Sequence, residues 1–178
     1  HIVCVNGRYV PGLSDVGALP KEVVVGDLAG AIASNRQRVS DCLGRHITVE
    51  QNAFEALNTA FLADGAFVFL PRGTVVREPI YLLYLAVPEA RPIVSHPRTL
   101  IVLEDNTQAS FVEVYATVGE GSCFTNEVTE LVAGENAIVD YHKVQHEGPD
   151  AFHMGTLCVS QARSSNVSST SFSLGASI

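Results

Sequence analysis

The sequence predicts a mainly β protein in which a hairpin and helical region, residues 1–64, precedes a body of short strands, residues 65–178. Three observations predict it. The stretch Phe54–Gly73 changes from the apolar spacing of a helix to a run of strand-forming residues after Asp64-Gly65. Beyond it, apolar runs alternate with turns rich in Gly, Pro, Asn and Asp. Helical patterns are missing between those runs, which argues against a doubly wound α/β sheet.

The first region contains signals for a hairpin and two helices. Asn6-Gly7 lies between the apolar strand Ile2–Val5 and an expected return strand, Arg8–Pro11, and this dipeptide favours a tight β-hairpin. Val23–Val25 is a further short strand candidate. Asp27 is a suitable N-cap and Gly44 a suitable C-cap for a helix. Its expected apolar face consists of Leu28, Ile32, Val39, Cys42 and Leu43.

The second predicted helix spans about Thr48–Ala63. Thr48 and Gln51 have the spacing of a capping box. We expect this helix to cover the first coil of the β body and to bury Phe54, Leu57 and Phe61. On that expectation, Phe61→Ala would cost ~3–5 kcal/mol of stability.

The β body has a weak internal repeat. Thr107–Tyr115 aligns with Ala137–Gln145 at an offset of 30 residues, and Ser165–Ser173 follows at an offset of 28. Repeats of this length fit the stacked coils of a β-solenoid, but the pattern alone favours a β-sandwich equally. The predicted strands are Ala66–Leu70, Thr74–Val76, Tyr81–Val87, Arg98–Leu103, Ala109–Ala116, Glu127–Leu131, Ala137–Val144, Met154–Ser160 and Asn166–Leu174.

Composition limits the classes of partner. The net charge is −8 and basic residues are scattered, so a nucleic-acid partner is not expected. The chain is 47% hydrophobic, yet its longest apolar run, Ile80–Val87, is far shorter than the ~20 residues of a membrane-spanning helix. We therefore expect no membrane partner. The high apolar content instead indicates strands buried on both faces, or an interface.

Cysteine usage indicates a reducing compartment. Cys4, Cys42, Cys123 and Cys158 are widely spaced and form no CxxC pair. We expect all four to be unpaired thiols that bind no metal. The chain begins at His1 rather than Met and ends at Ile178 without a terminating element, so we expect a fragment or a processed form.

The residues do not form a recognisable reactive site. His142 and His146 would lie on one side of a strand but about 13 Å apart, too far to share a metal ion. Glu127 and Glu130 differ by three positions and would lie on opposite faces of one strand. Cys123 and Cys158 lack a nearby base. We therefore assign no catalytic, cofactor-binding or metal-binding residue, and the protein is not expected to be an enzyme.

Five strings of the sequence are specific in combination: Asn6–Asp15, Ala56–Gly73, His96–Asp105, Phe124–Gln145 and Ser171–Ser177. In this order they resemble the SufB/SufD family of iron–sulfur cluster assembly proteins, and the resemblance extends over essentially the whole chain. SufB-like chains carry a cysteine-containing EGCTAP-like string where this chain has Glu113–Val118, without cysteine. The resemblance is therefore to the SufD branch, which the N-terminal segment also favours.

This resemblance implies a fold and a function. It implies a right-handed parallel β-helix core, here incomplete, and a scaffold that pairs with SufB and docks the ATPase SufC. A cluster would contact the full complex transiently, and this part of the chain would bind no cofactor. The protein would reside in the cytoplasm, or in the plastid stroma of a plastid-bearing organism. The family's proposed interface histidine lies outside these residues.

Two other functions are compatible with a β-helix. One is a carbohydrate-active enzyme, for which Glu113, Glu127, Glu130 and Asp140 are the candidate carboxylates. The other is a purely structural solenoid. Because the strands outnumber what the first region can cover, we also expect association with SufB or self-association. The edge of the last coil, about Asn166–Leu174, would provide the contact.

Overall fold

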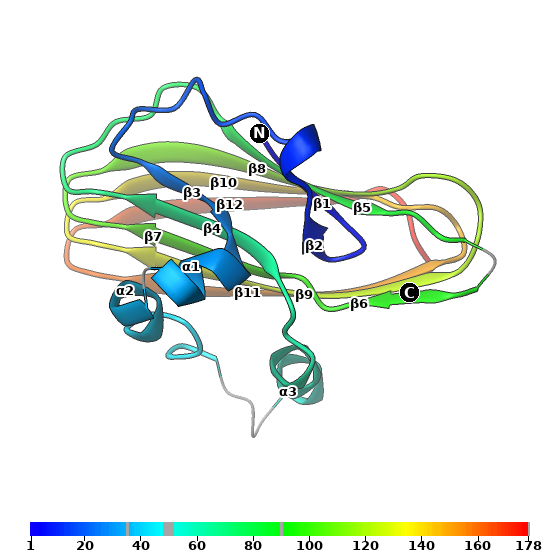
Figure 1. Ribbon diagram of the computed structural model, residues 1–178. Coiled ribbons are helices and arrows are strands. Elements are labelled where there is room, and N and C mark those ends of the chain that lie inside the picture. The colour runs from blue at the N-terminus through cyan, green and yellow to red at the C-terminus, as the bar shows by residue number, and fades with distance from the viewer. Residues whose placement is uncertain (35, 48–51, 90, 178) are drawn as a thin grey trace.

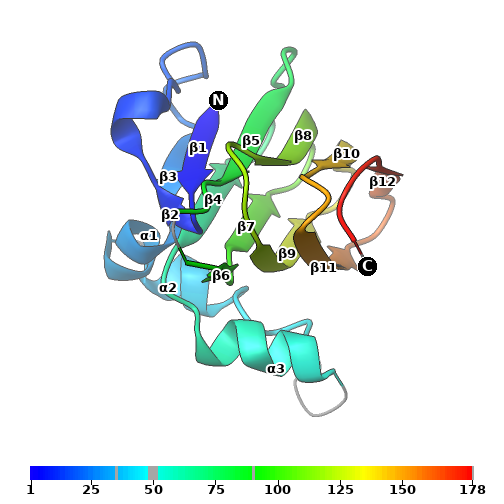
Figure 2. The same cartoon turned by 90° about the vertical axis from the view of Figure 1, so that its right-hand side faces the viewer.

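Two facing β-sheets wind into a parallel solenoid in the computed structural model, which describes residues 1–34, 36–47, 52–89 and 91–177 (Figure 1). One sheet, here sheet A, has the strand order β12-β10-β8-β5-β1-β2, and the other, sheet B, has the order β11-β9-β7-β4-β3 with β6 beside β9. In each coil the chain passes from sheet B to sheet A, and it returns to sheet B at the start of the next coil. The view along the strands shows the two sheets as two rows of strands around a common core (Figure 2). The expected β-helix is thus confirmed.

Four coils make up the body. They are the strand pairs β4–β5, β7–β8, β9–β10 and β11–β12, in which the first strand lies in sheet B and the second in sheet A. The strands are β4 (Gly65–Leu70), β5 (Ile80–Ala86), β6 (Ile93–Ser95), β7 (Arg98–Leu103), β8 (Gln108–Thr117), β9 (Cys123–Ala133), β10 (Ile138–His146), β11 (Ala151–Gln161) and β12 (Asn166–Ser173).

The register of sheet A explains the internal repeat. Ile138 of β10 lies beside Gln108 of β8 and Asn166 of β12, and the same offsets of 30 and 28 residues hold along the three strands. The repeat is therefore one coil of a solenoid and not a hairpin of a sandwich. Stacking places inward residues of one coil directly on those of the next.

The corners between the paired strands use one backbone conformation. Gly73, Asn106, Asn136 and Ser164 have φ angles of 77°, 58°, 57° and 59°, in the left-handed region. This conformation is natural for glycine, tolerated by asparagine and unfavourable for serine. The corners also stack on one another, because the N–H of Asn106 donates to Glu135 O and the N–H of Asn136 donates to Arg163 O.

The N-terminal segments complete the sheets at the start of the solenoid. Strand β1 (Ile2–Val5) pairs in parallel with β5, and the Asn6-Gly7 turn connects it to β2 (Arg8–Tyr9), as predicted. A short 3-10 helix, η1 (Pro11–Leu13), follows. Strand β3 (Val24–Asp27) pairs antiparallel with β4. The first region therefore extends both sheets of the β body.

All three helices lie on the sheet B side of the solenoid (Figure 2). They are α1 (Leu28–Ser34), α2 (Arg36–Ser40) and α3 (Ala53–Ala60). Asp27 caps α1, since its Oδ2 accepts from the N–H of Gly30 at 2.5 Å. Leu28 and Val39 are buried against outward residues of β4 and β7, but Ile32 is 40% exposed. The expected apolar face was therefore wrong at Ile32.

The position of α3 differs from the prediction. Its N-cap is Asn52, whose Oδ1 accepts from the N–H groups of Phe54 and Glu55. The proposed box of Thr48 and Gln51 lies outside the described residues. The helix packs on the outer face of β9 and does not cap the first coil. Phe61 is 63% exposed and Phe54 39%, so their predicted burial was wrong.

The buried face of α3 is polar, because it contacts a polar part of sheet B. Glu55 and Asn58 are its buried residues. Asn58 Nδ2 donates to the carbonyl oxygens of Pro97 and Asn126, at 2.9 and 2.8 Å. An apolar helix face could not satisfy these groups.

Other differences concern strand boundaries. Thr74–Val76 is not a strand, and Val75 makes only an isolated bridge to Gln108. The pattern did not reveal β6, which is three residues long. Strands β9 and β11 are longer than predicted because polar residues, such as Thr125 and His153, continue inside the solenoid. Within the described residues, no helix is long and apolar enough to cross a membrane.

Candidate functional site

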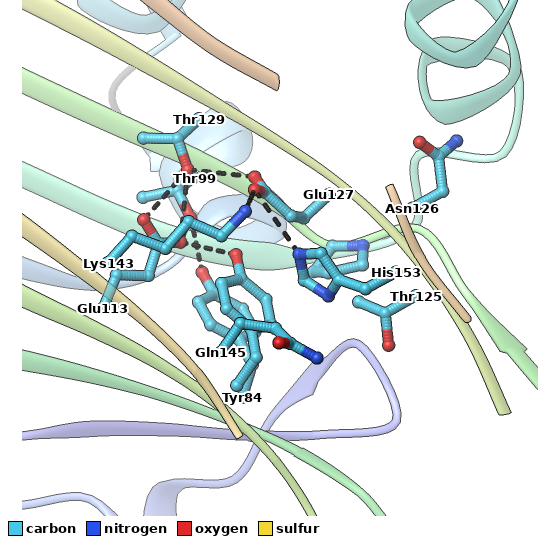
Figure 3. A network of polar contacts seen from close by, with 12 residues as sticks. Tyr84, Thr99, Glu113, Thr125, Asn126, Glu127, Thr129, Lys143, Gln145 and His153 are labelled. Carbon is cyan, nitrogen blue, oxygen red and sulfur yellow. Dashed lines mark hydrogen bonds and ion pairs between the residues drawn. The ribbon is translucent and has the colours of Figure 1, made fainter. Parts of the chain in front are cut away.

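The interior of the solenoid is apolar toward the corner with the left-handed residues and polar toward the opposite corner. Leu70, Leu103, Ala133 and Val139 belong to the apolar part. The polar part holds three glutamates, a lysine and a histidine, all supplied by the second to fourth coils (Figure 3). This polar part, here called the lumen network, groups these titratable side chains inside the solenoid.

Glu113, an inward residue of β8, is fully buried. Its Oε1 accepts from Tyr115 OH at 2.7 Å, and both carboxylate oxygens accept from Thr129 Oγ1 at 3.1 Å. Thr99 Oγ1 also donates to Oε1 at 2.9 Å, and Tyr141 OH donates to Oε2. Burial, together with the nearby charge of Glu127, raises the pKa of Glu113 despite these four hydroxyl donors.

Glu127, on the inward face of β9, forms an ion pair with Lys143 of β10. Thr129 Oγ1 lies 3.4 Å from Glu127 Oε2 and thereby connects the pair to Glu113. Lys143 Nζ also lies 5.2 Å from the centre of the Tyr115 ring, on its face. The lysine charge is therefore held between a carboxylate and an aromatic ring.

His153 and Glu147 form the end of the network nearest the last coil. His153 Nδ1 lies 2.8 Å from Glu147 Oε2, and its Nε2 lies 3.9 Å from Glu127 Oε1. The first contact has ion-pair distance but not the direction of a good hydrogen bond. Thr125 and Gln145 donate to Glu147 at 2.9 and 3.1 Å.

The two groups shift each other's pKa. Burial raises the pKa of Glu147, but His153, Gln145 and Thr125 together outweigh burial and leave that pKa below the ordinary value. Burial lowers the pKa of His153, but Glu127 and Glu147 outweigh it and leave that pKa above the ordinary value. The pair therefore favours a charged imidazolium between carboxylates.

Three tyrosines connect the network to the first coil. The rings of Tyr84 and Tyr115 stack with centroids 4.9 Å apart, and Tyr84 OH lies 2.6 Å from Thr99 Oγ1. Burial and the nearby carboxylates raise the pKa of Tyr115 and Tyr141 well above the ordinary value. These phenols therefore remain protonated and act as hydrogen-bond donors.

A second polar cluster lies on the outer face of sheet B, under α3. Arg98 Nη2 lies 2.6 Å from Glu130 Oε1, and both side chains are 1% exposed. Arg98 Nη1 also donates to Asn58 Oδ1 at 2.9 Å. The N–H of Gly44 donates to Glu130 Oε2 at 2.9 Å, so the same carboxylate holds the end of the segment after α2. This cluster fixes the helical region to the solenoid.

The structure places the sequence candidates as follows. His142 and His146 point outward from β10, as expected from a strand. Glu127 points inward and Glu130 outward, also as predicted. The sequence reasoning missed the approach of Glu113 to Lys143 and Glu127. A signal was present, because the 30-residue offset that aligns the repeats places Lys143 directly beside Glu113.

The cysteines are all unpaired thiols. Burial, with smaller effects from nearby carboxylates, raises the pKa of Cys4 to about 12. Burial also raises the pKa of Cys123 and Cys158. These thiols are weak nucleophiles at neutral pH.

The lumen network is enclosed by its own side chains. Glu113 and Glu127 are 0% and 2% exposed, and the hydroxyl and lysine partners fill the space between and around them. A polysaccharide could not reach two carboxylates arranged in this way.

Among the described residues, no three His, Cys, Asp or Glu side chains are grouped to hold a metal ion. An apolar hollow of about 300 Å³ lies beside α3, lined by Phe54, Phe124 and Phe152.

Comparisons with known proteins match the whole chain to one family. Residues 86–178 match the model described as "SUF system FeS cluster assembly, SufBD core domain". Residues 1–82 match the model described as "SufBD protein N-terminal region". The boundary between the two models falls within β5, so β1 to β4 belong to the N-terminal match.

Individual relatives are longer than this chain. An "iron-sulfur cluster assembly SufBD family protein" of Synechocystis sp. is 32% identical over 100% of this chain and 41% of its own length. The iron-sulfur cluster assembly protein SufD of Bacillus subtilis is 30% identical over 56% of this chain and 23% of its own length. A chloroplastic protein of Arabidopsis thaliana is 27% identical over 88% of this chain and 34% of its length. The chain thus spans less than half of these relatives.

Proposed function

Because the chain belongs to the SufBD family of iron–sulfur cluster assembly proteins, we propose that it is a scaffold subunit of a Suf complex. In this proposal it pairs with a SufB-like subunit, and the complete protein docks a SufC-like ATPase. The observation that carries the proposal is the ordered match of both family models to one continuous parallel β-helix. The iron–sulfur cluster is the cargo of the complex, and this chain performs no catalytic step of its own.

The SufD branch is the better assignment within the family. Where SufB-like chains carry a cysteine, this chain has the segment Glu113–Val118, and Glu113 enters the closed lumen network. A thiol near this position could not serve as an accessible sulfur acceptor, since the inward side of β8 is filled. The named SufD relative from B. subtilis supports the same branch.

The last coil is the place where further strands could be added. In the described residues, β12 pairs only with β10, and β11 pairs only with β9. Within these residues, each has one row of N–H and C=O groups without a strand partner. A following coil of the complete protein, a SufB-like β-helix or a second copy of the chain could pair with this row.

The expected compartment follows from the relatives. Two of the Arabidopsis relatives are described as chloroplastic, and the others include bacterial proteins. We propose that the protein works in the cytoplasm, or in the plastid stroma where the organism has plastids.

Affinity capture tests the proposal. The protein is expressed with a tag from its complete reading frame in its own source cells, and bound proteins are identified by mass spectrometry. The expected result is recovery of a SufB-like and a SufC-like subunit, in similar amounts, from tagged but not from untagged cells. A reciprocal capture with tagged SufC-like ATPase should recover this protein. Recovery of neither subunit in both directions would contradict the proposal.

A further inference from the structure

The segment that follows β12, residues 174–177, lies over the polar end of the lumen and is here called the exit segment. The N–H of Gly175 donates to Gln145 Oε1 at 3.3 Å, and the N–H of Ala176 donates to Glu147 O at 3.2 Å. A Cβ atom at Gly175 would overlap the backbone of Glu147. The exit segment is therefore held by Glu147 and by Gln145, which contacts it.

The side chain of Gln145 connects the exit segment to the Glu147 carboxylate. Its Nε2 donates to Glu147 Oε2 at 3.1 Å, and its Oε1 accepts from the N–H of Gly175. A glutamine amide has one donor end and one acceptor end. Because the carboxylate holds the donor end, the acceptor end is directed at the exit segment. Gln145 is buried, so it has no solvent alternative to these two partners.

The position of Glu147 in turn depends on the charge of His153. Among the ion pairs of the described residues, His153 is the only cation that contacts Glu147, whereas Glu127 is also paired with Lys143. His153 Nδ1 lies 2.8 Å from Glu147 Oε2 without the direction of a good hydrogen bond. The attraction therefore depends on the imidazolium charge. Glu147 is 5% exposed, and a buried carboxylate that loses its countercharge is strongly destabilised.

The groups that face His153 come from three strands and the turn after β10. Glu147 in that turn and Glu127 of β9 favour the imidazolium, and Lys143 of β10 opposes it (Figure 3). Tyr115 of β8 presents its ring at 70° to the imidazole, with centroids 4.8 Å apart. The exit segment has no titratable side chain. Two carboxylates against one lysine leave an excess of negative charge, which a proton on His153 balances.

We infer that His153 is a pH-dependent switch that fixes or releases the exit segment. With a proton on His153, the imidazolium holds Glu147, and Glu147 and Gln145 hold the backbone of Gly175 and Ala176. As pH rises, His153 releases this proton to solvent and Glu147 loses its countercharge. The carboxylate then moves toward water, and Gln145 no longer presents its oxygen to Gly175. The exit segment becomes mobile, while Glu127 keeps its own lysine partner.

The switch acts at the last coil of the solenoid. The N–H of Ser177 donates to Ala151 O at 2.7 Å, so the exit segment also contacts the first residue of β11. Within the described residues, β11 and β12 are the strands of the last coil, and each has an unpaired edge. Release of the exit segment therefore changes the order of the chain at the edge where further strands could pair.

Hydrogen exchange of the protein expressed from its complete reading frame, followed by mass spectrometry from about pH 6 upward, tests this inference. Exchange at the imidazole C2 position gives the pKa of His153 in the same samples. Protection of Gly175 and Ala176, relative to an unfolded peptide, should fall about tenfold, with its midpoint at that pKa. The N–H of Asn136, which donates to Arg163 O at a distant corner, is the internal reference and should change less than about twofold.

Three variants separate the switch from a general effect of pH. His153→Gln should make the protection of the exit segment independent of pH. His146→Gln, at an exposed position of β10, is the matched control and should keep the wild-type dependence. Glu147→Gln should lower the pKa of His153. Circular dichroism confirms that each variant is folded.

Two measurements on the wild type decide the inference even if His153→Gln does not fold. Protection of the exit segment that does not change with pH, or that changes with a midpoint away from the pKa of His153, would overturn it. A pH dependence that survives in folded His153→Gln, or an unchanged pKa of His153 in Glu147→Gln, would also overturn it.

Discussion

Gly155 lies directly beside Glu127 of the neighbouring coil. Because Gly155 has no side chain, Lys143 Nζ can occupy the space where a Cβ atom would lie. A Cβ atom at Gly155 would overlap both Nζ and the Glu127 carboxylate. The ion pair at the centre of the lumen network therefore depends on a glycine in the next coil.

Gly155→Ala should destabilise the protein by ~1–3 kcal/mol, because the buried ion pair has to shift to admit a methyl group. Urea unfolding measures the change. Gly12→Ala is the matched control, since a Cβ atom at Gly12 has no heavy atom within 4 Å. Its effect should stay within about 0.5 kcal/mol. Equal effects of the two substitutions would show that the lumen tolerates the methyl group.

Arg98→Met should cost ~3–5 kcal/mol, because it leaves Glu130 buried without its ion-pair partner. The double variant Arg98→Met/Glu130→Met should be more stable than the single variant, since it removes the isolated charge. Hydrogen exchange provides a second measurement. The N–H of Gly44, which donates to Glu130, should exchange faster in both variants. A single variant as stable as the wild type would contradict this account of the outer cluster.

Phe61→Ala should cost less than about 1 kcal/mol, because the side chain is 63% exposed and its ring stacks on His96, with centroids 5.4 Å apart. Phe67→Ala provides the comparison. Phe67 is 1% exposed beneath the helices, and its loss should cost ~3–5 kcal/mol. Thermal or urea unfolding of both variants distinguishes the two environments. If Phe61→Ala lowered the free energy of unfolding by several kcal/mol, the side chain would be buried, as the sequence first indicated.

His153 should make stability depend on pH. Its pKa is raised in the folded protein by Glu127 and Glu147, against the effect of burial. The resulting stabilisation is complete below the unfolded value of about 6.5 and is lost as pH rises through the folded pKa. Relative to His153→Gln, the wild type should therefore lose stability as pH rises from about 6.5 through the raised folded pKa of His153. His46→Gln, at an exposed position, should follow the wild type. If the free energy of unfolding changed with pH in the same way for the wild type and for His153→Gln, the protonation of His153 would not be coupled to stability.

Ser164→Gly should stabilise the protein by ~0.5–1 kcal/mol, because Ser164 adopts the left-handed conformation that the equivalent Gly73 adopts without strain. Asn136→Ser should have the opposite effect at the preceding corner. It would also remove the hydrogen bond from Asn136 Nδ2 to Asn106 Oδ1, which measures 3.1 Å. Chemical unfolding of the two variants measures whether the free energy of unfolding rises for Ser164→Gly and falls for Asn136→Ser. A destabilised Ser164→Gly would show that the serine has a favourable local role.

Local patterns predicted the strands well because alternation and turn residues act within a few positions of one another. Arg98–Leu103 coincides with β7, and Asn6-Gly7 forms the predicted turn. The coil register was also available in the 30-residue repeat. The pattern could not choose between solenoid and sandwich, because both bury alternate residues. That choice depends on pairing between residues about 30 positions apart.

The errors arose where polar groups are buried through long-range contacts. Helix α3 presents Asn58 to the sheet because Arg98 and Glu130 lie beneath it, and both come from distant strands. Periodicity alone assigned its apolar face inward. The lumen network was missed for the same reason. The local sequence around Glu113 does not show that this side chain is buried. Its partners Tyr141 and Thr129 come from the next coil and lie beside it only in the folded solenoid.

The dependence of Glu113 on Tyr141 and Thr129 also bears on how the chain folds during synthesis. The second coil holds this carboxylate, but two of its four donors come from the third coil. If a nascent chain folded when only its first two coils had emerged, it would bury Glu113 without the hydrogen bonds from Tyr141 and Thr129. We therefore expect the coils to close together after translation has passed Lys143, so that the ribosome-bound chain stays open rather than adding one finished coil at a time.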